Sequence, residues 1–315
     1  MVLRHTLHSL ANQPQLQTVA QQYGLQLGAK HIIAGTTIEQ VLQTIRAQQL
    51  QATLHYVAPP ATTNEEATRT KEQLLATIDA LATQNMDVQL AVKLTQLGLL
   101  FDVDTCYDHV RDVIEHAATA NIFVIIDTED ANTLTLTLEI VEELQKVFEN
   151  VGTVVQACLP DAPATTERFI RSHLCIVKGH ANESLDKLGI DIQYVELLES
   201  QLLHGAFTSI ATHDENIIEH VKRFVAEHHI PLEQFEFQLL YGFRKQLQQQ
   251  LAQQGYNVRT YVSFGEDWYS YYMHELAERP QHLSLVAKEV FTKKTNTALA
   301  IAAGAFLLGR LTKKK

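Results

Sequence analysis

Residues 88–127 read VQLAVKLTQLGLLFDVDTCYDHVRDVIEHAATANIFVIID, and this stretch holds one complete strand–helix–strand unit. It opens with the apolar run Val88–Leu94 and closes with the apolar run Ile122–Asp127. Between the two runs, apolar side chains recur at the three- and four-residue spacing of one helix face, at Val110, Val113, Ile114 and Ala117. A strand that is apolar throughout is typical of a parallel sheet covered by helices, so the unit predicts parallel strands.

The same alternation of short apolar runs and amphipathic helices continues along the chain. The eight runs are Ala52–Val57, Val88–Leu94, Ile122–Asp127, Thr153–Cys158, Leu174–Lys178, Phe207–Thr212, Phe235–Leu239 and Val258–Val262. Helix ends are marked as well, because Asp214 is a good N-cap and Gly255 is a good residue to follow a helix. Neither a GxGxxG fingerprint nor a P-loop is present. Eight such units predict an α/β fold, a closed (β/α)8 barrel, rather than an open sheet.

We expect this barrel to span residues 49–290, after a helical N-terminal segment of residues 1–48. Residues 291–315 form an apolar tail with a short C-terminal helix and a basic end, Lys313–Lys315. The tail's apolar run Ala298–Leu308 would measure about 16 Å as a helix, whereas a bilayer core of about 30 Å needs about 20 residues. Two interpretations stay open: docking on the barrel or a second subunit, and a peripheral membrane contact.

Composition narrows the classes of function. The chain has 315 residues, 46% of them hydrophobic, and a formal net charge of -11 without a basic stripe, which makes nucleic acid a poor partner. The cysteines number three, no CxxC or HExxH motif occurs, and we therefore expect neither a disulfide framework nor a metal site. Met1 to Gln15 lacks the apolar core of a signal peptide, and free thiols suit a reducing compartment, so we expect a cytoplasmic protein.

Polar residues stand at the ends of most of the predicted strands. They are Lys93, Asp127, Gln156, Lys178, Gly179, Thr212, His213, Gln238 and Tyr261. Barrel enzymes place their active sites at the carboxyl ends of the strands. We therefore expect a concave polar mouth that binds a large polar ligand.

The strand motifs resemble those of the FAD-dependent proline dehydrogenase family, in the family's order. The matching stretches are VKLTQLG (92–98), IDTED (126–130), VVQACLP (154–160), IVKG (176–179), ATHD (211–214), FEFQLLYG (235–242), VRTYV (258–262), GEDWY (265–269) and LAERP (276–280). The resemblance implies that FAD binds in the barrel mouth and takes a hydride from proline, giving pyrroline-5-carboxylate in proline catabolism towards glutamate. It also implies that the electrons pass to a membrane quinone, which would suit peripheral contact with the inner face of the membrane.

The resemblance also implies roles for individual residues. The positions that correspond to cofactor contacts are Thr128, Gln156, Lys178, Gly179, His180, Thr212, His213 and Gln238. Those that correspond to the substrate pocket are Lys93, Tyr261, Tyr271, His274, Glu275 and Glu278, and the catalytic candidates are Asp127 and Cys175.

Several positions depart from the family pattern. The family carries two arginines in Y-x-x-R-R-x-x-E, where they bind the substrate carboxylate, but here His274 and Glu275 stand in their place. Cys175 and Ala181 replace an arginine and a tyrosine of the family's R-L-V-K-G-A-Y motif. These changes predict weak turnover of L-proline, and they leave a related cyclic amine as substrate, or a flavin-binding pseudoenzyme, as alternatives. A third alternative, from the residues alone, is a Schiff-base enzyme that uses Lys93 or Lys178.

Overall fold

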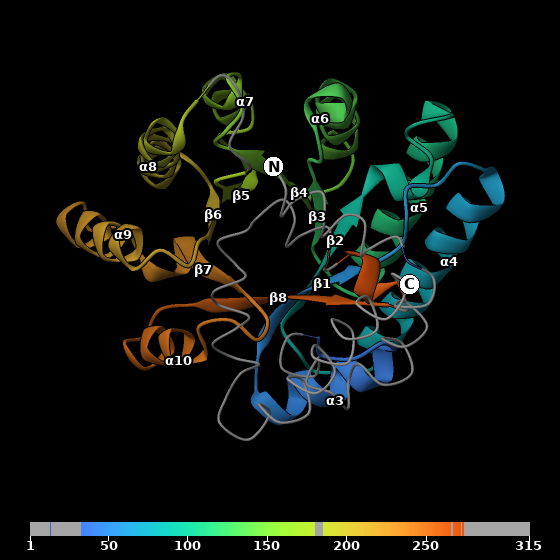
Figure 1. Cartoon of the computed structure of the whole chain (residues 1–315), viewed down its shortest axis with the longest axis horizontal. Helices are drawn as coiled ribbons and strands as arrows, with labels where there is room; N and C mark the ends of the chain where they lie inside the picture. Colours follow the sequence, from blue (N-terminus) through green and yellow to red (C-terminus); the bar gives the residue numbers. More distant parts are fainter. Residues whose placement is uncertain (1–12, 14–32, 180–184, 266, 272, 274–315) are drawn as a thin grey trace, which may run out of the picture.

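The computed structural model describes residues 13, 33–179, 185–265, 267–271 and 273, and these residues form a closed barrel of eight parallel strands (Figure 1). The strands pair in sequence order, and β8 returns to pair with β1, where His55 lies opposite Ser263. The strands are β1 (Gln51–Tyr56), β2 (Val88–Lys93), β3 (Val124–Asp127), β4 (Val151–Gln156), β5 (His173–Val177), β6 (Phe207–Ala211), β7 (Phe235–Leu240) and β8 (Val258–Phe264). The predicted (β/α)8 barrel is confirmed.

Helices form the outer layer around the strands (Figure 1). They are α3 (Ile38–Gln48), α4 (Asn64–Ala82), α5 (Val103–Thr119), α6 (Ala131–Gln145), α7 (Ala162–Arg168), α8 (Lys187–His204), α9 (Glu215–Glu227) and α10 (Lys245–Gln253), with the short 3-10 helices η2 (Leu94–Leu97) and η3 (Leu232–Gln234). Most begin at a side-chain cap, because an oxygen there accepts from otherwise unpaired backbone N–H groups. Asp214 accepts from the backbone N–H of Asn216 at the start of α9, which confirms the predicted cap.

The main hydrophobic core lies between the barrel and the helices. Its largest buried side chains come from both layers, with Leu74 and Ile78 on α4, Ile114 on α5, and Leu54 and Leu90 on the strands. Each fully buried side chain of this size contributes about 1.5–3 kcal/mol. This core fixes the positions of the strand ends, where the site lies.

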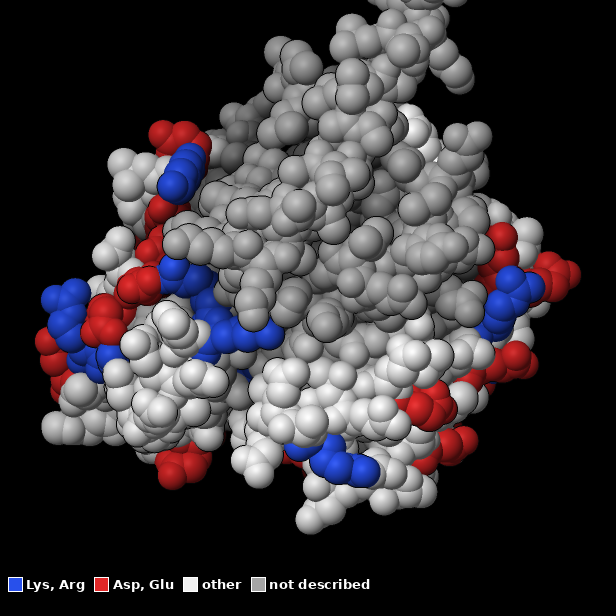
Figure 2. Space-filling view, turned by 60° about the horizontal axis from the view of Figure 1, so that its bottom comes forward, with Lys and Arg blue, Asp and Glu red and all other residues white. Residues whose placement is uncertain are grey.

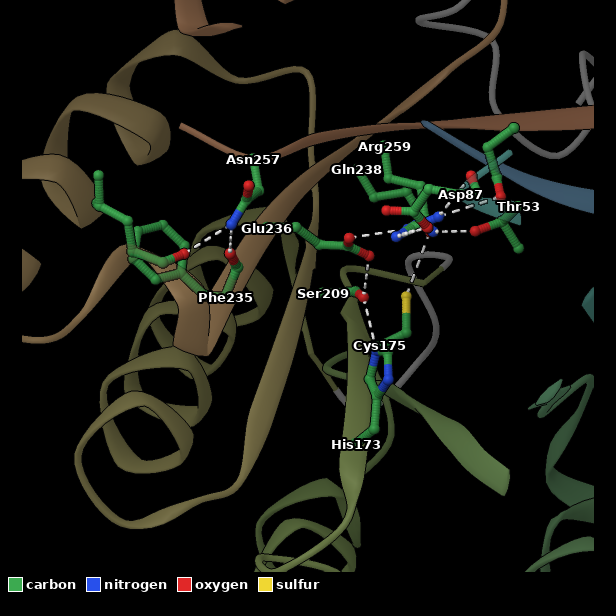
Figure 3. Close-up of polar contacts among 12 residues, drawn as sticks. Thr53, Asp87, His173, Cys175, Ser209, Phe235, Glu236, Gln238, Asn257 and Arg259 are labelled. Carbon is green, nitrogen blue, oxygen red and sulfur yellow. Dashed lines mark hydrogen bonds and ion pairs between the residues drawn. The ribbon is translucent and has the colours of Figure 1, made fainter. Parts of the chain in front are cut away.

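The inside of the barrel differs from this core, because buried polar side chains of several strands bond one another there (Figure 3). A separate small apolar cluster joins Ile125, Val154 and Cys175. Arg259 of β8 donates to Glu236 of β7 at 2.8 Å, and both side chains are almost fully buried. Figure 3 shows Ser209 between Glu236 and His173, and its hydroxyl donates to Glu236 at 2.6 Å. The barrel floor is therefore a connected polar network.

His173 makes the stability of this network depend on pH. Burial and the charge of Arg259 lower the pKa of its imidazole from 6.5 to about 3. The folded state thus keeps His173 neutral, while the unfolded state takes up a proton below pH 6.5. The contribution of His173 is complete above pH 6.5 and is lost as the pH falls towards 3.

We expect a loss of about 2 kcal/mol in unfolding free energy between pH 6.5 and 4.5 from this residue, allowing for the partial exposure of the ring. His173→Phe keeps a ring between Phe123 and Phe207 but does not titrate. Urea unfolding of both proteins at several pH values measures the effect. If the unfolding free energies of the wild type and of His173→Phe change with pH in parallel, His173 does not titrate as described.

The strands differ from the predicted runs by one or two residues at their ends, and the two-residue differences occur in β3, β4 and β8, which continues to Phe264 rather than Val262. β4 begins at Val151, two residues before the predicted Thr153, and ends at Gln156. Gly152 lies inside β4, where a Cβ would clash with the backbone oxygen of His173 on the neighbouring strand β5, so the close approach of the two strands requires glycine. β3 begins at Val124 rather than Ile122.

The ends of the chain are described only in part. Within the predicted N-terminal segment the structure describes the helix α3, which Thr37 precedes without a side-chain cap bond. Most of residues 1–32, and the whole tail from residue 291, lie outside the described residues. In the part that is described, no helix is long and apolar enough to cross a membrane.

Charged side chains on the face in Figure 2 are mixed in sign, with basic groups beside acidic ones. Many are paired elsewhere on the surface too, as in the ion pairs Arg168–Glu142 and Lys71–Asp112. Such pairs neutralise one another locally, so they produce little field at long range.

Candidate active site

Four of the predicted site residues meet at the mouth of the barrel. Lys93 and Asp127 are register partners at the carboxyl ends of β2 and β3. The hydroxyl of Tyr261, on β8, donates to Oδ2 of Asp127 at 3.0 Å, and this bond crosses the barrel interior. The ammonium of Lys93 lies 5.4 Å from the ring centroid of Tyr271, within reach of a cation–π contact. A cation, a carboxylate and two phenols thus share one pocket.

His55 of β1 belongs to the same pocket, although the sequence analysis did not select it. Its ring lies 5.9 Å from that of Tyr261 and 5.3 Å from that of Tyr271. It was missed because the predicted run Ala52–Val57 ends in an apolar residue, and His55 stands two residues earlier. The signal available in the sequence was the two-residue spacing of Thr53 and His55, which places both side chains on one face of the strand.

The residues predicted to contact the cofactor occupy the other side of the mouth. Gln156, Lys178, Thr212 and Gln238 belong to or directly follow β4, β5, β6 and β7, four neighbouring strands. His213 follows Thr212, and its ring lies 5.8 Å from that of Phe243. Polar groups therefore form a continuous arc along β4–β7.

Several members of this arc also hold the loops in place. Nε2 of Gln156 donates to the backbone oxygens of Thr128 at 2.8 Å and Glu129 at 3.1 Å, which fixes the loop after β3. The hydroxyl of Thr128 donates to the backbone oxygen of Val154. The hydroxyl of Thr212 accepts from the backbone N–H of Asp214 at 3.1 Å. The arc is therefore pre-organised by bonds within the protein.

Lys178 lies between two carboxylates. Its ammonium is 2.6 Å from Asp191 of α8 and 3.3 Å from Asp214 at the start of α9. Burial acts to raise the pKa of the Asp214 carboxyl, but the charge and hydrogen bond of Lys178 outweigh burial and hold it below its usual value. A Schiff-base lysine needs burial or a neighbouring cation, whereas Lys178 lies between two carboxylates.

Gly179 is required by packing inside the protein. Its φ is +73°, a left-handed conformation, and a Cβ there would stand 2.3 Å from Sγ of Cys158. The family resemblance places Gly179 among the cofactor contacts. The contact with Cys158 is by itself sufficient to demand glycine.

Cys175 lies inside the barrel, below the mouth (Figure 3). Its thiol donates to Oε1 of Gln238 at 3.4 Å, and Nε2 of Gln238 donates to the hydroxyl of Thr53 at 3.0 Å. Burial, together with Asp127 and Glu236, raises the pKa of this thiol well above its ordinary value. A protonated thiol is a poor nucleophile, so Cys175 has the environment of a hydrogen-bonding rather than a covalent group.

Four predicted residues, His180, His274, Glu275 and Glu278, lie outside the described residues. Among the residues that the structure does describe, no group of three His, Cys, Asp or Glu side chains could hold a metal ion.

The comparison with known proteins agrees with the barrel fold and identifies a family. The family model described as "Proline dehydrogenase" matches residues 38–172 and 185–278. Proline dehydrogenase 1 of Bacillus subtilis (strain 168) is 37% identical over 302 residues, which cover 93% of this chain and 100% of that protein. Proline dehydrogenase of Deinococcus radiodurans is 33% identical over 304 residues, covering 90% of this chain and 96% of the relative.

A solved structure with the same fold is proline utilization A from Bdellovibrio bacteriovorus, inactivated by N-propargylglycine. It aligns with a TM-score of 0.74 at 19% identity, over 84% of this chain and 33% of that longer chain. This likeness shows that the two proteins share the barrel fold. The chain belongs to the proline dehydrogenase family.

Proposed function

We propose that this chain is a FAD-dependent oxidoreductase that takes a hydride from proline or a related cyclic amine. The observation that carries the proposal is the division of the mouth into two arcs. Polar donors line β4–β7, and the charged and aromatic group of Lys93, Asp127 and Tyr261 lies on β2, β3 and β8. A long polar cofactor suits the first arc, and a small amino acid suits the second.

The donor set fits FAD in its chemistry. Lys178 offers a positive charge for phosphate, Thr212 and His213 offer a hydroxyl and an imidazole, and the amides of Gln156 and Gln238 can orient polar ring atoms. Lys178 must then be shared between the phosphate and its partners Asp191 and Asp214. When bound, FAD would supply the hydride acceptor.

The chain's own residues would bind and orient the amine. Lys93 offers a cation to the substrate carboxylate. Asp127 offers an acceptor for the amine, and its bond with Tyr261 fixes the carboxylate in one orientation. Tyr261, Tyr271 and His55 enclose the pocket with rings, which excludes water from the reacting atoms.

The proposal extends to the electron acceptor and to location. A quinone would take the electrons, and the basic end of the tail, Lys313–Lys315, would contact anionic headgroups from the cytoplasmic side. The rest of the chain carries the acidic charge, so a basic cluster at its end is the feature that motivates this part.

The first test is the flavin itself. We expect protein desalted after incubation with FAD to stay yellow, with absorbance near 450 nm. Anaerobic addition of cyclic amines should bleach that band for at least one amine, with L-proline acting weakly. Protein that keeps FAD but is bleached by none of them would favour the pseudoenzyme, and colourless protein would reject FAD binding.

Lys178→Met should weaken FAD binding by about 10-fold, the value of one charge-assisted contact. Lys222→Met is a matched control. The ammonium of Lys178 lies 5.9 Å from the ring centroid of Tyr194, and that of Lys222 lies 5.9 Å from the ring centroid of Tyr256, but Lys222 is on α9 outside the barrel. Fluorescence titration of FAD measures both. Equal affinity in the two variants would remove Lys178 from the cofactor site.

A further inference from the structure

His55 is an inward-facing residue of the barrel mouth. Thr53, two residues earlier on β1, receives a hydrogen bond from Gln238 of β7 across the interior. Residues two apart on a strand share a face, so His55 points into the same space, one layer nearer the mouth. Its contacts with the rings of Tyr261 and Tyr271 agree with that direction.

The imidazole of His55 is fully buried, and neither of its ring nitrogens has a hydrogen-bond partner among the residues that the structure describes. Buried polar groups are nearly always paired, and an unpaired one destabilises the fold. Packing against two tyrosine rings would be served equally well by an apolar ring. The nitrogens of His55 are therefore better explained by a ligand than by the fold.

The charge around His55 indicates which ligand. Burial, and then the positive charge of Lys93, hold the pKa of His55 well below 6.5. The ring is therefore neutral near pH 7, with one N–H donor and one bare nitrogen. The positive potential that Lys93 imposes on this ring opposes a cation beside it and favours an anion.

We propose that His55 is a specificity-determining residue whose ring N–H donates a hydrogen bond to the carboxylate of the substrate, next to the ammonium of Lys93. This assignment rests on the proposed function for the kind of substrate that enters the pocket. It gives the pocket a second donor for the carboxylate, in a chain where His274 and Glu275 stand at the family's arginine positions.

Two probes separate the carboxylate from the amine. Cyclopentanecarboxylate has the ring and the carboxylate but no nitrogen, and pyrrolidine has the ring and the amine but no carboxylate. Isothermal titration measures both on the full chain, with and without added FAD. His55→Phe removes both nitrogens and keeps a ring, and His55→Gln keeps a donor and an acceptor.

We expect His55→Phe to lower the affinity for cyclopentanecarboxylate by about 10-fold, because a hydrogen bond to a charged group is worth about that factor. The affinity for pyrrolidine should stay unchanged. His55→Gln should stay within about threefold of the wild type. The melting temperature of His55→Phe should equal or exceed that of the wild type, because the variant no longer buries unpaired nitrogens.

The inference is overturned if His55→Phe binds cyclopentanecarboxylate as the wild type does, or if the wild type does not bind it at all. If His55→Phe and His55→Gln lose the same affinity for cyclopentanecarboxylate, or if His55→Phe loses affinity for pyrrolidine to the same extent, the role of His55 is purely steric and the inference is overturned too. The failure of the proposed function has a different signature, which is protein that retains no FAD. Carboxylate binding that depends on His55 in protein without FAD would support the inference in that case.

Discussion

Replacing Arg259 by methionine is expected to lower the free energy of unfolding by about 3–5 kcal/mol, the usual loss when one partner of a buried ion pair is removed. Arg259 and Glu236 are 6% and 2% exposed, and Nε of Arg259 lies 2.8 Å from Oε2 of Glu236. Without the guanidinium, the carboxylate stays buried, and among the described residues the hydroxyl of Ser209 is its remaining side-chain donor. Urea unfolding near pH 7 measures the loss.

The pH dependence and a double variant identify the cause. Burial already raises the pKa of Glu236 while Arg259 lowers it, so removing Arg259 leaves the upward shift unopposed. An acid whose pKa is raised on folding destabilises the fold as the pH rises, so the deficit of Arg259→Met should be smaller at pH 5 than at pH 8. Adding Glu236→Met should recover at least about 2 kcal/mol, because the unpaired charge disappears.

Arg168→Met is the matched control. Arg168 pairs with Glu142 on the surface, where both side chains are more than one third exposed. Solvent-exposed pairs of this kind contribute little, so we expect no measurable loss. A loss as large as that of Arg259→Met, or a double variant no more stable than the single one, would contradict the explanation from burial.

The sequence was informative about the outer surface of the barrel and misleading about its interior. Continuous apolar runs predicted all eight strands, because the outward-facing side chains of a parallel barrel pack beneath helices. The same rule treats every strand residue as core, and it fails at Glu236 and Arg259, which point inward. The alternation of Glu236 and Gln238 with Phe235 and Phe237 was visible in the sequence. The contacts of Arg259 with Asp87 and of Gln238 with Thr53, however, join residues far apart in the chain and appear only once the barrel is closed.

The candidate site shows the same division. Selecting polar residues at strand ends found Lys93, Asp127 and Tyr261, which the structure brings into one pocket. It did not find His55, because the strand continues beyond it. The ion pair between Asp191 on α8 and Lys178 was not predicted either. The local sequence around a residue on a helix surface does not indicate which strand end that residue will contact.

The second large effect concerns the pair His274 and Glu275. Changing both to arginine should raise kcat/KM for L-proline by about 10²–10⁴-fold, because each charge-assisted contact with a carboxylate is worth about 1.5–3 kcal/mol. Both residues follow Tyr271 closely in sequence, and the ring of Tyr271 lies against Lys93 and His55 in the pocket. The substitution Glu275→Arg also reverses the charge at that position, which replaces repulsion of the substrate carboxylate by attraction.

Steady-state kinetics with an artificial electron acceptor measures the gain, and most of it should come from a lower KM, because the carboxylate takes no part in hydride transfer. Gln249→Arg with Gln250→Arg adds two positive charges on the exposed face of α10 and should change nothing. Efficient turnover of L-proline by the wild type would show that the two positions matter less than the family pattern implies. If the arginines do bind the carboxylate, the loss caused by His55→Phe should shrink in the double variant, because the substrate then no longer depends on a single imidazole N–H beside Lys93.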